Sequence, residues 1–362
     1  MYARIVHRRT IQNSGVAVAA ITATALLLQY PDAVYNGMQR GMAVCTSVIL
    51  PTLFPFMLLA GWLADSSLCR QPGRCSQAMA RRLFGLPGCC APAILLSLVG
   101  GYPAGMIAIS RLYRQGQIQQ EELRRMSAFC LCGGPGFIVG TVGIGLMGSA
   151  HAGWLLYAAQ ALTAVSIGIL LGRGHHTTES APIPAPPRPF ARMVADTCQA
   201  LLTMCGFVTT ATMVLSLSEG LGIPHAIARL TPLSASTMRA ITAGLLEVSS
   251  GCIAVANIPL APLWLSLCLG WGGLSIHGQL DAILSEERVI CRRFWWWRLL
   301  QGGISGGIAM GLFYLFPPQQ STGTSTMIPL PFSVSASASY MLLGLCFLTM
   351  LCFSEKKTGK TL

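Results

Sequence analysis

The sequence is dominated by apolar segments that are about as long as a bilayer is thick. A helix needs about 20 such residues to cross the hydrocarbon core. Only 10% of the residues are charged, against roughly a quarter in soluble proteins. This argues against a soluble enzyme, a disordered chain or a secreted disulfide scaffold, and it predicts an all-α polytopic membrane protein. The apolar segments are 14–30, 41–64, 91–110, 127–147, 152–172, 197–218, 240–257, 259–277, 295–316 and 339–353.

The 14 cysteines form no CxxC pair and no Cys/His cluster with zinc-ligand spacing. Most of them lie inside apolar segments, where cysteine behaves as a small hydrophobic residue. We therefore expect no metal site and no cofactor.

The N-terminus carries Arg4, Arg8 and Arg9 before an apolar run at 16–28, which is also the pattern of a signal peptide. No A-x-A cleavage site follows the run. We therefore expect a first membrane helix that is retained.

The segment 91–110 is interrupted by the motif GGYPAG (100–105). Proline removes a backbone donor and glycine loosens a helix, and in lipid such a break is tolerated only where protein or a polar cavity surrounds it. Basic residues flank the segment on both sides, and the positive-inside rule prefers both clusters in the cytoplasm. The segment is therefore predicted to be a re-entrant helical hairpin. The flanking residues are Arg70, Arg74, Arg81 and Arg82 before it, and Arg111, Arg114, Arg124 and Arg125 after it.

The same rule, applied to the whole chain, predicts about eight transmembrane helices with both termini in the cytoplasm. The segment 240–257 is interrupted at Ser249-Ser250-Gly251 and is predicted to be a second hairpin that dips from outside. Arg298 is assigned to the cytoplasmic side. The net charge of +12 is thus explained by orientation, and no nucleic-acid partner is expected. Of the 24 basic residues, only Arg40, Arg229 and Arg239 fall outside.

The two halves of the chain repeat one order: helix, interrupted hairpin, Gly-rich helix, helix. The first half has GGYPAG (100–105) followed by CLCGGPGFIVG (130–140), and the second has LEVSSGC (246–252) followed by CLGWGGLSIHG (268–278). Inverted repeats with broken helices are typical of secondary transporters, whose substrate binds near the breaks. Coincidence between two Gly-rich apolar stretches is the alternative.

Several runs of the sequence resemble the YlbJ-type sporulation integral membrane proteins, within the nucleoside-recognition or gate-domain superfamily. The resemblance covers about residues 40–316, and its most specific part is GGYPAG followed by a basic R-L-x-x-x-G-x-I segment. The runs are LFPFMLLAGWL (53–63), RRLFGLPGCCAPAILLSLVGGYPAGMIAISRLYRQGQI (81–118), SAFCLCGGPGFIVGTVG (127–143), GLLEVSSGC (244–252) and GWGGLSIHGQ (270–279).

The resemblance implies a transporter related to concentrative nucleoside transporters and to the membrane part of bacterial ferrous-iron transporters. Within the family it implies a role in spore formation, where dipicolinic acid is thought to cross the outer forespore membrane. The first Gly-rich helix has Cys-Gly-Gly-Pro-Gly where more Asn and Ser are expected, which leaves the substrate open. The implied organisation is an N-terminal helix (1–40), a first gate-type repeat (41–172), a cytoplasmic Pro-rich linker (173–196), a second gate-type repeat (197–316), and an outer loop, last helix and basic tail (317–362).

Glu247 is the one acidic residue set deep in an apolar segment. A carboxylate there costs several kcal/mol unless it is paired or neutralised, which makes it a functional candidate. Ser249 and Ser250 follow it, and Tyr102 and Pro103 occupy the first hairpin tip with Gly101. Free amides at the N-termini of half-helices suit an anionic substrate. Kinked packing helices are the alternative.

The Gly-rich helices supply the other candidate substrate-binding residues. Ser275 and His277 end the second one, and His277 is either a proton carrier or an interfacial residue. Gly133, Gly134 and Gly272 allow close helix approach or lend carbonyl groups to a site.

The sequence therefore predicts a transporter or permease for a small polar, anionic solute in the bacterial cytoplasmic membrane, or in the outer forespore membrane of a spore former. The alternatives are a nucleoside or ion permease and a non-transporting membrane assembly protein. No HExxH, GxSxG or Walker motif is present, so no enzyme is expected. The expected partners are a dipicolinate-like or nucleoside solute and the lipid bilayer, and a homo-oligomer is left open.

Overall fold

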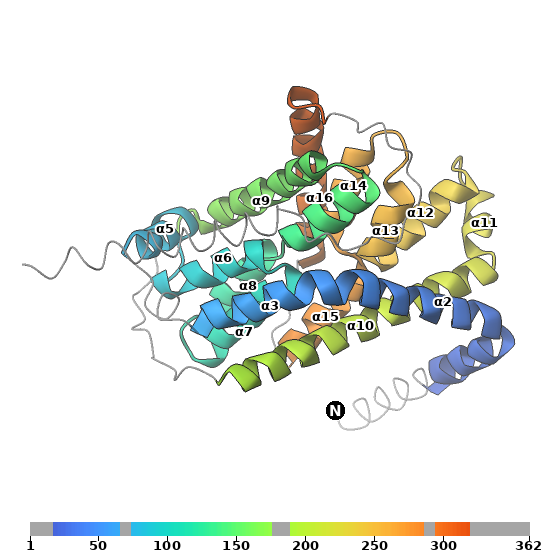
Figure 1. Cartoon of the computed structure of the whole chain (residues 1–362), viewed down its shortest axis with the longest axis horizontal. Helices are drawn as coiled ribbons and strands as arrows, with labels where there is room; N and C mark the ends of the chain where they lie inside the picture. Colours follow the sequence, from blue (N-terminus) through green and yellow to red (C-terminus); the bar gives the residue numbers. More distant parts are fainter. Residues whose placement is uncertain (1–16, 66–73, 176–188, 286–293, 319–362) are drawn as a thin grey trace, which may run out of the picture.

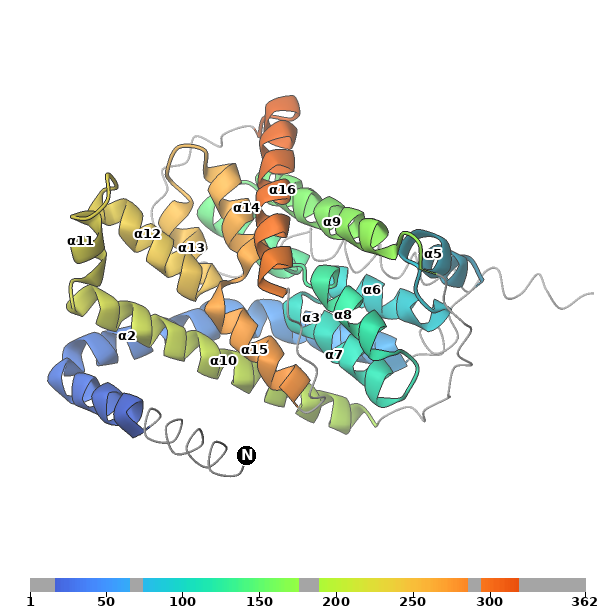
Figure 2. The same cartoon turned by 180° about the vertical axis from the view of Figure 1, so that it is seen from behind.

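The computed structural model describes residues 17–65, 74–175, 189–285 and 294–318 (Figures 1 and 2). Within these ranges the chain is helical and contains no strand. The predicted last helix (339–353), the basic tail and most of the predicted linker (173–196) lie outside the described residues.

Three described helices are long and apolar enough to cross a bilayer: Pro31–Leu59, Ala150–Gly172 and Phe190–Gly220. A fourth candidate is the pair Ser76–Phe84 and Gly88–Val99, which is bent by 105°. Together with the all-helical fold, these helices are consistent with a polytopic membrane protein. The count of about eight spans stays a prediction.

A long helical rod begins directly after a helix over Ala17–Gln29. It consists of α2 (Pro31–Val44), the π-helical segment η1 (Cys45–Ile49) and α3 (Leu50–Asp65). The predicted segment 41–64 is thus the later part of a helix that starts at Pro31, where proline fits the first helical turn. The rod lies beside α10 (Phe190–Gly220) in both views (Figures 1 and 2).

Two glycines set the close approach of α2 to α10. A Cβ atom at Gly37 would lie 2.6 Å from the Cα of Met213, and one at Gly41 would lie 2.6 Å from the Cα of Thr209. The glycines are four residues apart, so they share one helix face and leave a groove in which the backbone of α10 lies.

The first half folds into short helices and one long helix. The interrupted segment 91–110 forms two helices, α6 and α7, that are broken at Gly100-Gly101 as the sequence predicts. Gly101 has φ of +82°, which favours glycine. The elements are α5 (Arg74–Phe84), η2 (Gly88–Cys90), α6 (Ala91–Val99), α7 (Tyr102–Arg114), α8 (Gln120–Phe129), the π-helical segment η3 (Gly136–Leu146) and α9 (Ala150–Gly172).

The second half has a similar order. Its hairpin break lies at Glu247, which is extended with φ −149° and ψ 132°. The predicted break at Ser249-Ser250-Gly251 is therefore wrong, because these residues form the first turns of α13. The elements are α11 (Ile223–Ala228), α12 (Ala235–Leu246), α13 (Val248–Val255), α14 (Ala261–Trp271), α15 (Gly273–Ser285) and α16 (Phe294–Leu315).

Two acidic residues of α10 hold the bases of the two hairpins. Asp196 pairs with Arg111 at the end of α7 (3.8 Å) and with Arg192 (3.2 Å). At a rise of about 1.5 Å per residue, the second acid, Glu219, lies about 35 Å away along the helix.

Glu219 pairs with Arg40 of α2 (3.5 Å) and with Arg239 of α12 (3.7 Å). These are two of the three basic residues that the sequence places outside. The hairpins α6–α7 and α12–α13 are thus attached to opposite ends of α10.

Candidate functional site

Each hairpin break lies against a break in the helix that follows it. A Cβ atom at Gly101 would lie 3.2 Å from the backbone nitrogen of Gly134, in the irregular stretch between α8 and η3. In the second half, a Cβ atom at Gly273 would lie 2.9 Å from the Cα of Glu247. The structure therefore pairs the motifs that the sequence singles out, 100–105 with 130–140 and 246–252 with 268–278.

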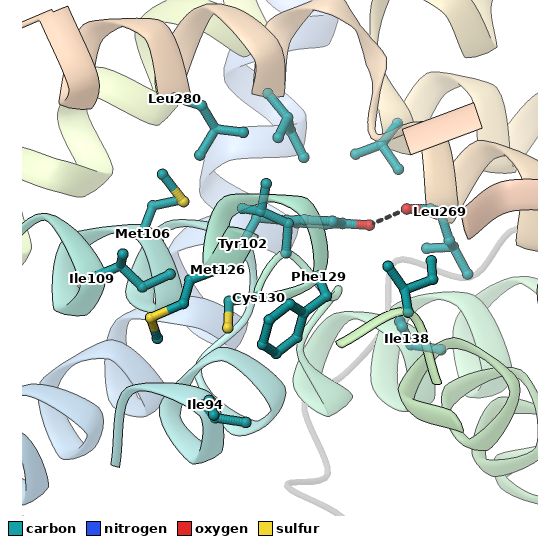
Figure 3. Close-up of a cluster of buried hydrophobic side chains, with 14 of the residues drawn as sticks. Ile94, Tyr102, Met106, Ile109, Met126, Phe129, Cys130, Ile138, Leu269 and Leu280 are labelled. Atoms are coloured by element: carbon teal, nitrogen blue, oxygen red, sulfur yellow. Dashed lines mark hydrogen bonds between the residues drawn. The ribbon is translucent and has the colours of Figure 1, made fainter. Parts of the chain in front are cut away.

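Tyr102 connects the two halves. Its hydroxyl donates a hydrogen bond of 2.6 Å to the carbonyl of Leu269 near the end of α14 (Figure 3). The ring is buried in a cluster to which both halves contribute, with Met106 and Ile138 from the first and Leu280 from the second (Figure 3). Tyr102 thus joins the start of α7 to the helix that precedes the second break.

Arg298 of α16 lies where the two broken helices meet. One guanidinium nitrogen, Nη1, donates to the carbonyl of Leu131 (2.7 Å) and to Oε1 of Gln301 (2.6 Å). The other, Nη2, donates to the carbonyl of Gly270. Leu131 lies in the irregular stretch between α8 and η3. Gly270 lies in the last turn of α14, just before the break at Gly272-Gly273. The side chain of Arg298 therefore contacts the backbone beside both breaks.

Arg298 is not a solvated residue of a cytoplasmic loop, because only 1% of its surface is exposed. A signal was available in the sequence, since Arg298 lies inside the predicted span 295–316. An arginine within such a span is itself a functional candidate.

Neutral polar side chains extend the contacts of Arg298. Nε2 of Gln160, on α9, donates to the carbonyl of Ser266 (2.9 Å) and to Oγ of Ser305 (2.9 Å). Nε2 of Gln301 approaches Oε1 of Gln160 at 3.4 Å. This buried network ties α9, α14 and α16 together, and sequence reasoning missed it because glutamine and serine carry no distinctive pattern.

Glu247 is fully buried, as its position in the apolar segment predicts. Its Oε1 accepts a hydrogen bond from the amide of Ser249 (2.9 Å), and its Oε2 accepts one from the amide of Ser250 (2.6 Å). The expectation of free amides at these serines is therefore wrong, because the carboxylate of Glu247 caps the helix that follows it.

The first hairpin has no such cap. Gly101 precedes α7 without a side-chain hydrogen bond to it, and Pro103 in the first turn has no amide hydrogen to donate. The two predicted N-termini therefore differ, with the second one closed by a carboxylate and the first one without a side-chain cap.

Ser275 and His277 lie in the first turns of α15, just after Gly272-Gly273. Both are buried, and neither Oγ of Ser275 nor Nε2 of His277 has a hydrogen-bond partner within the described ranges. Nδ1 of His277 lies 2.7 Å from the carbonyl of Gly273. The imidazole stands between aromatic rings, with centroids 4.4 Å away at Trp271, 4.9 Å at Trp295 and 5.2 Å at Phe294.

The candidate glycines are in tight contact with their surroundings. A Cβ atom at Gly133 would lie 3.1 Å from Oη of Tyr102, and one at Gly134 would lie 3.1 Å from the nitrogen of Gly101. Gly272 has φ of +83°. The contacts of Gly133 and Gly134 agree with the close-approach alternative, whereas at Gly272 the positive φ is what favours glycine.

A cavity of about 50 Å³ lies between α3, the hairpin α6–α7 and α10, and Ala104 of the first hairpin motif lines it. Its lining is largely apolar, with Met57, Leu96 and Ile107, and the ion pair of Arg111 and Asp196 lies at its wall. The meeting point of the two breaks, in contrast, is filled by the side chains of Tyr102 and Arg298.

A known membrane protein is similar to the chain in sequence. The chain is 26% identical over 315 residues to the sporulation integral membrane protein YlbJ of Bacillus subtilis (strain 168), covering 77% of both chains. No protein-family model matches the chain, and no solved structure matches it. The chain is thus similar to an integral membrane protein of sporulation along most of its length, which confirms the resemblance to the YlbJ-type proteins.

Proposed function

We propose that this membrane protein is a transporter for a small polar, anionic solute. The observation that carries the proposal is the pairing of each hairpin break with a broken helix, and the joining of the two pairs by buried polar side chains. Broken helices expose backbone groups, and in transporters these groups bind the solute near the middle of the membrane. No chemical conversion of the solute is part of the proposal.

The proposal includes two hairpins that enter the membrane from opposite sides, within an inverted repeat of two gate-type halves and about eight spans. The ion pairs of α10 support it. Asp196 holds the base of the first hairpin, and Glu219 holds the base of the second about 35 Å away. This separation exceeds the hydrocarbon thickness of about 30 Å.

For the solute we favour a small dicarboxylate such as dipicolinate, as the resemblance to the YlbJ-type proteins implies. The uncapped N-terminus of α7 and the buried cation of Arg298 both favour negative charge. The proposed location is the cytoplasmic membrane, or the outer forespore membrane if the organism forms spores, with both termini in the cytoplasm.

The test is solute uptake by vesicles that contain the purified full chain. Radiolabelled dipicolinate and uridine are offered separately, and protein-free vesicles of the same lipid are the control. We expect uptake of dipicolinate above the control and little uptake of uridine. Uptake of uridine alone would favour the nucleoside permease, and uptake of neither solute would contradict the proposal.

A further inference from the structure

We propose that Arg298 selects the charge of the transported solute, as a fixed internal cation whose balancing carboxylate is supplied by the solute. The inference rests on the proposed transport function and adds a residue that binds the anion. It is carried by the burial of Arg298, by the absence of a carboxylate partner among the described residues and by its contacts beside both breaks.

The burial of Arg298 is costly. Removing a charged group from water costs several kcal/mol unless a partner of opposite charge compensates. Among the described residues, the ion pairs involve Arg40, Arg111, Arg124, Arg192 and Arg239, and none involves Arg298. The other fully buried charged residue is Glu247, which makes its hydrogen bonds to the backbone of α13.

The bonds of Arg298 to carbonyl groups do not by themselves require a charge. Gln160 bonds a carbonyl of α14 in the same network, and Gln301 approaches the carbonyl of Leu131 at 3.4 Å. Neutral side-chain amides therefore suffice to hydrogen-bond the backbone carbonyls around Arg298. The positive charge is what arginine adds, and the carbonyl dipoles around it stabilise that charge without cancelling it.

Arg298 is hydrogen-bonded to the backbone beside both breaks, so a movement of either break would change the surroundings of its charge. It bonds Leu131 in the first irregular stretch and Gly270 just before the second. If the backbone at Leu131 or at Gly270 shifted, the guanidinium N–H group that is bonded to that carbonyl would be released. A planar guanidinium binds a carboxylate through two parallel hydrogen bonds, so a solute carboxylate is well matched to the groups released.

The experiment measures how transport depends on the charge of the solute. Three solutes of similar shape are used in the vesicle assay: pyridine-2,6-dicarboxylate, its monoamide and its diamide. The proteins are the wild type, Arg298→Gln and Arg298→Lys, each checked for a monodisperse, folded state in detergent. Arg125→Gln is the matched control, because Arg125 is also buried (8% exposed) and bonds a backbone carbonyl, that of Gly85, away from the breaks.

We expect wild-type vesicles to take up the dianion in preference to the diamide. Arg298→Gln should lower dianion uptake about tenfold or more, which corresponds to 1.4 kcal/mol or more, and should remove the preference for charge. Arg298→Lys should keep part of the preference, and Arg125→Gln should keep all of it. A purely structural role predicts instead that Arg298→Gln lowers uptake of all three solutes equally, which would overturn the inference.

Competition in the wild type provides a readout that needs no variant. The diamide should compete poorly with labelled dianion, and equal competition by the two would overturn the inference even if the variants fail to fold. Wild-type vesicles that transport all three solutes at one rate would contradict the inference alone. Vesicles that transport none of them would contradict the proposed function as well.

Discussion

At the scale of single residues, Glu247 shows how a charged side chain is accommodated in an apolar segment. The residue is extended and ends α12, and its own carboxylate accepts the amides of Ser249 and Ser250 that open α13. A carboxylate at a helix N-terminus is also favoured by the helix dipole. Glu247 therefore both interrupts the helix and, through its carboxylate, stabilises the start of α13.

Replacing Glu247 by alanine should destabilise the protein by about 1–2 kcal/mol, the usual cost of losing an N-cap. The amides of Ser249 and Ser250 both lose their acceptor in this variant. Glu247→Gln keeps one acceptor oxygen and should lose less. Thermal unfolding in detergent, followed by tryptophan fluorescence, compares the two with the wild type, and equal midpoints for all three proteins would contradict the capping role.

The residue scale also shows what the sequence could not predict. The span 295–316 places Arg298 close to one end, where a long side chain can extend towards water. Its inward direction depends on carbonyls of Leu131 and Gly270, which only become neighbours when the two halves pack together. No local pattern of residues contains that information.

At the scale of helices and breaks, the first hairpin was predictable because glycine and proline mark it. The second was misplaced by a few residues, because Ser249, Ser250 and Gly251 look like a break although they continue a helix. Glutamate favours helices in isolation. Glu247 interrupts one here because its carboxylate satisfies amides that would otherwise be buried without partners.

The contact of α2 with α10 gives a prediction about an element. Gly41→Ala places a methyl group 2.6 Å from the Cα of Thr209, and backbone cannot move aside easily. We expect a loss of about 1–3 kcal/mol, the usual cost of overpacking. The midpoint of thermal unfolding in detergent should fall accordingly.

The matched control is Gly206→Ala on α10, where the added methyl group meets nothing within 4 Å. This change should leave stability equal to the wild type or raise it by about 0.5–1 kcal/mol, because alanine favours a helix over glycine. If both variants lost the same stability, the close contact between α2 and α10 would not be what limits substitution at Gly41.

At the scale of the whole molecule, the charge pattern predicts one orientation, and the ion pairs of α10 attach the two hairpins to opposite ends of this helix. Two of the three basic residues expected outside, Arg40 and Arg239, share Glu219. Their charge is therefore partly balanced, which lessens the conflict with the positive-inside rule. The spatial pairing of the hairpins with α10 could not be read from the sequence, because Asp196 and Glu219 are distant from their partners along the chain.

Accessibility of single cysteines tests this orientation. In a chain whose native cysteines are replaced by alanine, Gln120→Cys lies near the Asp196 end and Leu230→Cys near the Glu219 end, and both positions are exposed. A membrane-impermeant thiol reagent applied to intact cells should label Leu230→Cys and leave Gln120→Cys unlabelled until the cells are opened. Labelling of both from outside would contradict hairpins that enter from opposite sides.

The cap made by Glu247 has a consequence for dilute anions. Its carboxylate is tethered next to the amides of Ser249 and Ser250, so it competes with any free carboxylate at an effective concentration of about millimolar or more. Anions far below that concentration cannot displace it. The N-terminus of α7 has no tethered competitor. The two half-helices look equivalent in the sequence, but in the structure the N-terminus of α13 is capped by the protein's own carboxylate and that of α7 has no side-chain cap.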